Sequence, residues 1–206
     1  MSAKQQLFEE INRHLISDEK PSTYFNGIKE ELFFSEVPFT MLSRLKNTPQ
    51  SPQHHPEGNV WNHTMLVTDE AAKVKEKSKN ANVFMWAALL HDIGKADTTK
   101  IRKDRITSYD HEKLGETLSK RFLSEFIDDE GFIESVAGLI RWHMQILFVV
   151  KSMPFADIKM MKQQTDVREV ALLGLCDRLG RLDVDEKQEQ QNINLFLQKC
   201  NIQGIL

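Results

Sequence analysis

The sequence predicts an all-α protein built as a helical bundle, and three observations support this fold class. Apolar residues recur at helical spacing over long segments. Only 9 glycines and 6 prolines occur in 206 residues, and they cluster in a few places. No segment of useful length shows the strict alternation of apolar and polar residues that is typical of a half-buried strand, so we expect no strands.

The apolar spacing predicts helices over most of the chain. They cover residues 4–16, 22–33, 38–46, 59–78, 82–92, 110–127, 130–146, 155–163, 166–181 and 185–200. Two segments are expected to be irregular: 46–59, which holds three prolines and a glycine, and the polar, basic segment 94–109. The length of the chain suits one domain that spans residues 1–206.

Composition limits the classes of function. Hydrophobic residues make up 40% of the chain, which suffices for a core, and the net charge of −3 argues against general nucleic-acid binding. Two cysteines, Cys176 and Cys200, form no CxxC pair, which suits a reducing cytoplasm. No apolar signal core begins the chain, and no apolar run approaches the roughly 18 residues of a membrane span. We therefore expect a cytoplasmic protein with no membrane partner.

Six ionisable residues lie on the apolar faces of five predicted helices, where core residues are expected. They are His63, His91, Asp92, His111, His143 and Asp177. A lone buried histidine usually bonds a backbone carbonyl, and a lone aspartate can cap a helix or pair with an arginine. Burying all six separately would cost roughly 1–3 kcal/mol each if they were unsatisfied. One metal site satisfies them together, since neutral imidazole and carboxylate are ligands that transition metals favour.

The same residues carry a resemblance to a known family. His63, the His91-Asp92 doublet in HDIGK and Asp177 match the H…HD…D pattern of the HD-domain metal-dependent phosphohydrolases. Five stretches further resemble the HD domain of bacterial CCA-adding tRNA nucleotidyltransferases. They are HHPEGNVWNHTMLV (54–67), HDIGKADTT (91–99), YDHEKLGETL (109–118), IRWH (140–143) and DRLGR (177–181).

The resemblance covers about residues 49–181, so we expect helices from 1–48 and 183–206 to pack on this motif core. No strand-rich nucleotidyltransferase domain precedes the core, and no GYP motif occurs in the chain. The chain thus resembles a free-standing HD domain. CCA addition itself is not expected, and the likeness to cyclic-di-GMP phosphodiesterases is only partial.

The resemblance implies that four residues hold one divalent ion: His63, His91, Asp92 and Asp177. In HD proteins with two metals, residues matching His111 and His143 bind a second ion and the doublet aspartate bridges the pair. The alternative is that these two histidines surround a single ion or bind phosphate. One or two divalent ions are therefore expected as cofactor, and Mn, Fe, Ni, Co, Mg and Zn stay open.

The expected chemistry is attack by a metal-activated hydroxide on phosphorus, with Asp92 and Lys95 as catalytic residues and no covalent protein intermediate. Lys95 is also expected to contact the phosphate, against the alternative of a solvated lysine. Arg178 and Arg181 could clamp phosphate, although one could form a structural salt bridge instead. His55 is expected at the rim of the site. The basic segment Lys100–Arg105 could attract an anionic substrate.

The sequence thus favours a phosphodiesterase or phosphatase that acts on a nucleotide or a related small phosphate ester. RNA ends are the one exception to the argument against nucleic acid. Two alternatives stay open: a mixed-valence di-iron oxygenase, which uses the same ligand set in some HD proteins, and a sensor module that retains the site for ligand binding. The oligomeric state stays open as well.

Overall fold

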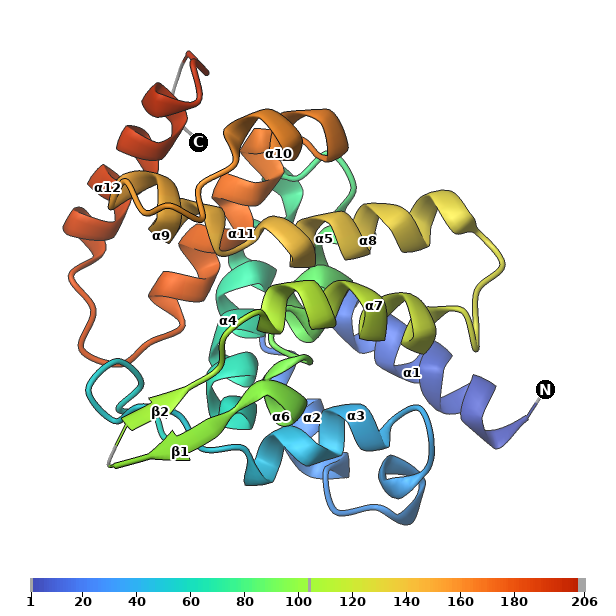
Figure 1. Cartoon of the computed structure of the whole chain (residues 1–206). Coiled ribbons are helices and arrows are strands. Elements are labelled where there is room, and N and C mark those ends of the chain that lie inside the picture. Colours follow the sequence, from blue (N-terminus) through green and yellow to red (C-terminus); the bar gives the residue numbers. More distant parts are fainter. Residues whose placement is uncertain (1, 104, 204–206) are drawn as a thin grey trace.

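The computed structural model describes residues 2–103 and 105–203 and confirms the predicted all-α bundle (Figure 1). Its α-helices are α1 (Ala3–Ser17), α2 (Ser22–Ile28), α3 (Thr40–Ser43), α4 (Val60–Val74), α5 (Ala81–Leu90), α6 (Lys95–Thr98), α7 (His111–Leu123), α8 (Glu130–Trp142), α9 (Gln145–Val150), α10 (Ile158–Gln164), α11 (Val167–Leu179) and α12 (Glu186–Lys199). The 3-10 helices are η1 (Leu32–Ser35), η2 (Arg44–Asn47) and η3 (Lys75–Lys77). The structure does not describe residues 1, 104 and 204–206. These positions belong to the segments 1–48, 94–109 and 183–206 considered above.

Polar side chains fix the start of five of the helices. At each of these helices the preceding Asn or Asp accepts a hydrogen bond from a backbone N–H of the first turn, which would otherwise lack a partner. These caps are Asn59 before α4, Asn80 before α5, Asp129 before α8, Asp166 before α11 and Asp185 before α12.

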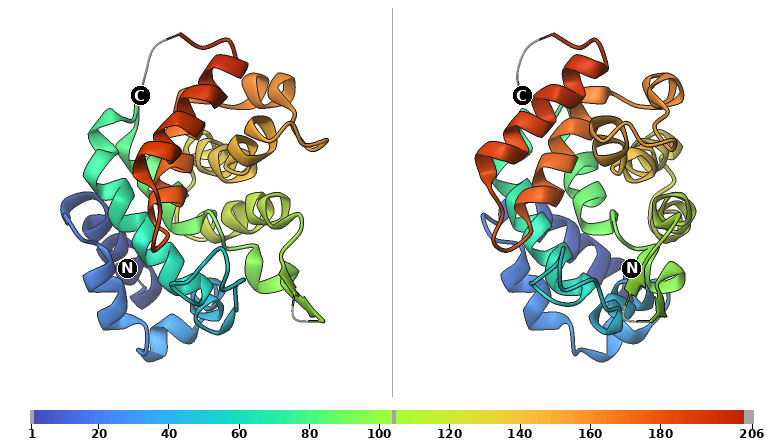
Figure 2. Two further views of the ribbon diagram at one scale, coloured as in Figure 1. Left: turned by 90° about the vertical axis from the view of Figure 1, so that its left-hand side faces the viewer. Right: turned by 60° about the vertical axis from the view of Figure 1, so that its left-hand side comes forward.

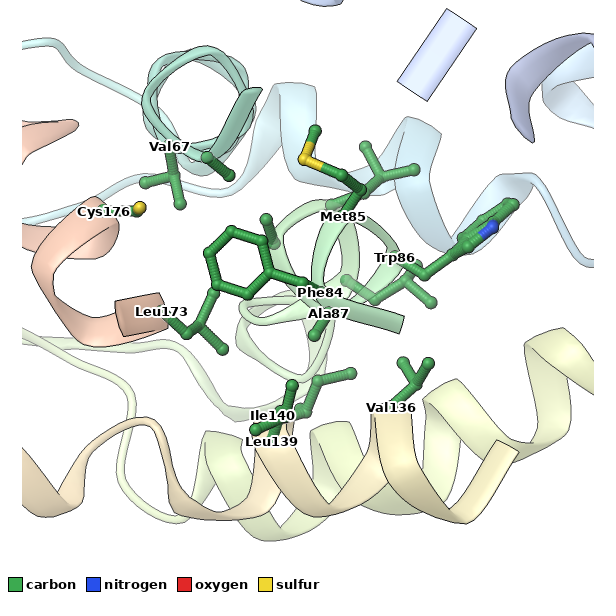
Figure 3. Packing of buried hydrophobic residues seen from close by; sticks show 14 of the residues in the cluster. Val67, Phe84, Met85, Trp86, Ala87, Val136, Leu139, Ile140, Leu173 and Cys176 are labelled. Atoms are coloured by element: carbon green, nitrogen blue, oxygen red, sulfur yellow. The ribbon is translucent and has the colours of Figure 1, made fainter. Parts of the chain in front are cut away.

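Helix α5 forms the centre of the core. All its residues from Val83 to Leu90 are buried, and it contacts α1, α4, α8 and α11. Figure 3 shows Phe84 of α5 among Val67 of α4, Leu173 of α11 and Ile140 of α8. A helix that is apolar on every side is stable only where neighbours cover it all round, which is why this one lies in the centre. Around it, α1 packs on α5, and α12 packs on α9 and α11 (Figure 2).

The prediction that the chain has no strands is wrong at one place. Strands β1 (Lys100–Arg102) and β2 (Arg105–Thr107) pair antiparallel within the segment that was expected to be irregular. Each strand has three residues, which is too short for an alternating pattern to be recognised. The short helix α6 also falls in this segment.

The segment 130–146, expected as one helix, is divided into α8 and α9 around His143 and Met144. By length and composition alone, the segment Glu130–Val150 is long and apolar enough to cross a membrane, which was not expected of any segment from the sequence. In this structure 56% of its most apolar window is buried within the protein. Helix α8 packs on α5, α7 and α11, so the segment has the surroundings of a core helix.

Candidate metal centre

The fold brings together the six ionisable residues that the sequence singles out. His63 lies in the second turn of α4, and His91 and Asp92 follow the last turn of α5. His111 begins α7, His143 follows α8, and Asp177 lies near the end of α11. All six are buried, with exposed fractions of 0% for His63 and His91, 1% for Asp92, 2% for His143, 5% for His111 and 7% for Asp177.

Asp92 lies at the centre of this cluster. Its Oδ2 faces His91 Nε2 at 3.3 Å and His63 Nε2 at 3.9 Å. Its Oδ1 faces His111 Nε2 at 3.3 Å and His143 Nε2 at 3.9 Å. The cluster thus has two halves that share one carboxylate, and each half could hold a metal ion.

Hydrogen bonds set the tautomers of three of the histidines. The Nδ1 atoms of His91, His111 and His143 lie 2.7–2.8 Å from the backbone carbonyls of Ala88, Ser108 and Ile140. A carbonyl only accepts, so each Nδ1 carries the proton and each neutral ring presents a lone pair at Nε2. This arrangement is typical of metal-binding histidines.

The cluster therefore contains acceptors that face one another. His91 Nε2 has no hydrogen-bond partner among the described residues, and it lies 3.3 Å from Asp92 Oδ2. His111 Nε2 and His143 Nε2 lie 3.3 Å apart. Buried acceptors without donors are costly, and a cation placed between them removes that cost. The donor set of imidazoles and carboxylates therefore fits a divalent metal ion.

His63 differs from the other three because carboxylates flank both its nitrogens. Its Nδ1 lies 2.9 Å from Glu57 Oε1 and its Nε2 lies 3.0 Å from Asp177 Oδ1. Burial alone would lower the pKa of His63, but Asp177 and Glu57 outweigh it and raise this pKa. The two carboxylates therefore favour the form of His63 that is protonated on both nitrogens when no ion is bound, and an ion at Nε2 would replace one proton.

Both aspartates are held ionised. Burial works to raise the pKa of Asp92, but the ammonium of Lys95 at 2.7 Å holds it well below its usual range. Burial likewise opposes ionisation of Asp177, and Arg181 and His63 hold its pKa well below the usual range. A carboxylate must be ionised to bind a metal ion, so both groups are in the required state at neutral pH.

The residues predicted to bind substrate fall into two groups. Lys95 lies with its Nζ 2.7 Å from Asp92 Oδ2 and donates to Gln50 Oε1, and Arg181 donates to Asp177 Oδ1 at 3.2 Å. Both line the large pocket above the cluster, as does His55. Arg178 does not line that pocket; its guanidinium lies 3.4 Å from Glu189 of α12. A phosphate-binding role for any of the four stays a prediction.

Glu57 is the main site residue that sequence reasoning missed. Besides facing His63, its Oε1 lies 2.8 Å from His55 Nδ1, and its side chain is almost fully buried. The chain turns back toward α4 after Glu57, since Gly58 has φ +102° and Asn62 donates to the Glu57 carbonyl. The resemblance of the stretch HHPEGN to the HD domain of CCA-adding enzymes was the only signal for Glu57. The spacing of the residues does not predict that Glu57 lies beside His63.

The pocket above the cluster has a volume of about 890 Å³. Asp92, His111, His143 and Asp177 contribute to its lining. One wall comes from residues 106–113, which lead from β2 into α7, and another comes from residues 141–157, which include α9 and the loop after it. An anionic group bound at the cluster thus has room for a larger substituent.

Comparison with known proteins agrees with this geometry. The family model described as HD domain matches residues 60–182. The multifunctional CCA protein of Methylococcus capsulatus (strain ATCC 33009 / NCIMB 11132 / Bath) is 26% identical over 186 residues, which is 90% of this chain and 37% of that protein. The protein of the same name from Actinobacillus pleuropneumoniae serotype 5b (strain L20) is 38% identical over 82 residues, or 40% of this chain and 20% of that protein.

A further multifunctional CCA protein, from Halorhodospira halophila (strain DSM 244 / SL1), is 40% identical over 104 residues, covering 50% of this chain and 23% of that protein. The matches to these relatives thus span between a fifth and just over a third of their lengths. The resemblance to HD domains and to CCA proteins that the motifs indicated is confirmed.

Proposed function

Since this chain belongs to the HD domain family, we propose that it is a metal-dependent phosphohydrolase that acts on a nucleotide or a related small phosphate ester. The observation that carries the proposal is the convergence of three Nε2 atoms, those of His91, His111 and His143, on the buried carboxylate of Asp92. Such a site suits a divalent cation, and the pocket beside it admits a substrate.

The ligands we propose fall into two sets that share Asp92. His63, His91, Asp92 and Asp177 hold one ion, and His111 and His143 complete a second position with Asp92. A divalent ion in such a site polarises phosphoryl oxygens and lowers the pKa of a water molecule. The backbone carbonyls behind the rings and Glu57 behind His63 orient the ligands.

The charges of the site favour an anionic substrate once the site is loaded. Without an ion, three buried carboxylates face three cationic groups: Asp92, Asp177 and Glu57 against Lys95, Arg181 and protonated His63. Exchange of the His63 proton for a divalent ion leaves this set with a net positive charge. A phosphate ester is therefore attracted into a pocket with low-dielectric walls, where the attraction is strong.

Lys95 and Arg181 are the groups of the chain that can orient the phosphate. The ammonium of Lys95 has three donors. One donates to Gln50 Oε1, and the charge forms an ion pair with Asp92. Arg181 uses one Nη for Asp177, and its Nε has no hydrogen-bond partner among the described residues. Lys95 thus keeps a donor for a phosphoryl oxygen, and Arg181 lines the pocket, which supports the role proposed for them in substrate binding.

The end of an RNA strand is a second candidate substrate. The hairpin of β1 and β2 exposes Lys100, Arg102, Lys103 and Arg105, and its second strand leads directly into the wall of the pocket. Basic side chains at that position suit a phosphate backbone that continues away from the site. If RNA ends are substrates, hydrolysis of an oligonucleotide with a terminal phosphate should be faster than that of the mononucleotide and should fall steeply with salt.

The proposal is tested with protein stripped of metal by a chelator and reloaded with Mn²⁺, Ni²⁺, Co²⁺, Mg²⁺ or Fe²⁺. We expect metal-dependent hydrolysis of bis-p-nitrophenyl phosphate and of some members of a nucleotide panel. His91→Ala and Asp92→Ala should lose metal binding and activity and keep helical circular dichroism, whereas His14→Ala, a histidine on α1 outside the cluster, should keep both.

Two results would contradict the proposal. One is full activity of His91→Ala or Asp92→Ala in chelator. The other is tight iron binding with oxygen consumption and no phosphate release, which would favour the di-iron oxygenase instead.

A further inference from the structure

Aromatic side chains line both of these walls of the pocket beside the metal centre, and phosphate chemistry gives no reason for them. Tyr109 and Phe155 are exposed over 73% and 61% of their surface, and both line this pocket. Phe148 also lines the pocket and packs against Phe155, with 5.6 Å between their ring centroids. Single exposed apolar residues are common on proteins, but several that share one pocket indicate a surface that binds something.

The exposed position of Phe155 is built into the fold. The buried side chain of Gln145 donates to the Phe155 carbonyl at 3.1 Å and accepts from the Asp157 N–H at 2.9 Å. The backbone N–H of Met153 donates to the Phe148 carbonyl at 2.8 Å and closes the turn after α9. These bonds hold the loop backbone on both sides of Phe155, so its ring is presented to the pocket by a fixed scaffold.

The aromatic side chains lie close in sequence to the proposed metal ligands. Tyr109 precedes His111 by two residues, and Gln145 follows His143 by two residues. The segment that leads into α7 and the loop after α9 lie on the same side of the molecule (Figure 2). Because these rings and the cluster line the same pocket, a substrate whose phosphate lies at the metal centre can extend its remaining part over Phe155 or Tyr109.

The exposed rings of Tyr109 and Phe155 suit a flat aromatic group. Bases stack on aromatic side chains whatever their sequence, because every base offers a π-face. A sugar phosphate has no base to cover the rings of Tyr109 and Phe155. These two side chains would therefore contribute little to its binding. The pocket volume of about 890 Å³ leaves room for a nucleoside beside the phosphate site.

We propose that Phe155, packed against Phe148 and positioned by Gln145, is a stacking platform for the nucleobase of the substrate, with Tyr109 as a further aromatic contact. The inference rests on the proposed function, since it assigns the substrate class of the same site: phosphate esters of nucleosides rather than of plain sugars or alcohols.

The first test measures base binding without any hydrolysis. Saturation-transfer NMR with adenosine, which has no phosphate, is recorded on chelator-treated protein. We expect transfer to the base protons in the wild type and in Met160→Ala, an exposed residue of α10 that does not line the pocket. Phe155→Ala should weaken adenosine binding by about 5- to 100-fold, the range for one lost stacking contact, and Phe155→Trp should restore it.

The second test compares hydrolysis of a nucleoside monophosphate with that of the matching ribose phosphate in metal-loaded protein. Phe155→Ala should lower kcat/KM for the nucleotide by a similar factor and leave the ribose phosphate unchanged. Failure of adenosine to bind the wild type, or equal binding by Phe155→Ala, would overturn the stacking platform while leaving the hydrolase proposal intact. Adenosine binding that depends on Phe155, together with no hydrolysis of any ester, would support the platform and refute the hydrolase.

Discussion

Replacing Gly94 by alanine would disturb the packing that holds His111 beside Asp92. A Cβ at position 94 would lie 2.2 Å from the carbonyl oxygen of His111 and 2.8 Å from the backbone nitrogen of Gly115. Both atoms belong to the backbone of α7, so no side chain can rotate away. Gly94 itself has φ −71° and ψ −16°, which alanine adopts freely, so the only penalty is the clash.

The size of the penalty follows from the distances. Ordinary C···O contacts are about 3.3–3.6 Å, so the start of α7 must move by about 1 Å. Added atoms in a packed interior cost roughly 1–3 kcal/mol, and a clash with backbone belongs in the upper part of that range, about 2–3 kcal/mol. The lower entropy of the unfolded alanine chain offsets about 0.4–1 kcal/mol of this cost. For a domain of this size we expect Tm to fall by about 2–10 °C. Because His111 moves with α7, the affinity for a divalent ion should fall as well.

Thermal unfolding in chelator, followed by circular dichroism, measures the first effect, and Mn²⁺ titration measures the second. Gly27→Ala is the matched control, because a Cβ there meets no described atom within 4 Å. Gly27 lies within α2, so alanine should leave stability unchanged or raise it by about 0.5–1 kcal/mol. A Gly94→Ala protein with the Tm and Mn²⁺ affinity of the wild type would refute the packing argument.

Three further predictions concern residues around the cluster. Glu57→Gln, which keeps the shape and removes the charge behind His63, should weaken divalent-ion binding about 10- to 100-fold; equilibrium dialysis measures this, and an unchanged affinity would show that Glu57 does not orient His63. Asp69→Ala removes the acceptor of Ser22 N at 2.9 Å and Ser22 Oγ at 2.7 Å in a buried contact, so urea unfolding should show a loss of about 1–3 kcal/mol with unchanged metal affinity. The raised pKa of His63 stabilises the metal-free protein at low pH, and this contribution is lost as the pH rises through that pKa. Ion binding should therefore release protons and become stronger as the pH rises. Calorimetry in two buffers of different ionisation enthalpy should then give different apparent binding enthalpies.

Periodic apolar spacing was enough to predict the helical class. It was also enough to find the cluster, because His63, His143 and Asp177 stand at core positions of their helices, where an ionisable residue needs a reason. Those inferences depend only on which face of a helix a residue occupies.

Features that depend on contacts across the fold could not be predicted. Glu57 reaches His63 because the chain turns back at Gly58, and that turn leaves no periodic pattern. Arg178 and Arg181 both follow Asp177 closely, yet Glu189 of α12 binds the first and only the second lines the pocket. The three-residue strands were missed because they are too short to show an alternating pattern. The break at His143 was missed because the apolar composition continues from α8 into α9.

The measurement that tests the central claim most directly is a Mn²⁺ titration of chelator-treated protein in which bound ion, by electron paramagnetic resonance, and nucleotide hydrolysis are recorded on the same samples. The account predicts that hydrolysis rises in step with the binding of one or two ions per chain, and that Asp92→Ala neither binds nor hydrolyses. Hydrolysis that is independent of bound ion, or stoichiometric binding that survives in Asp92→Ala, would contradict it.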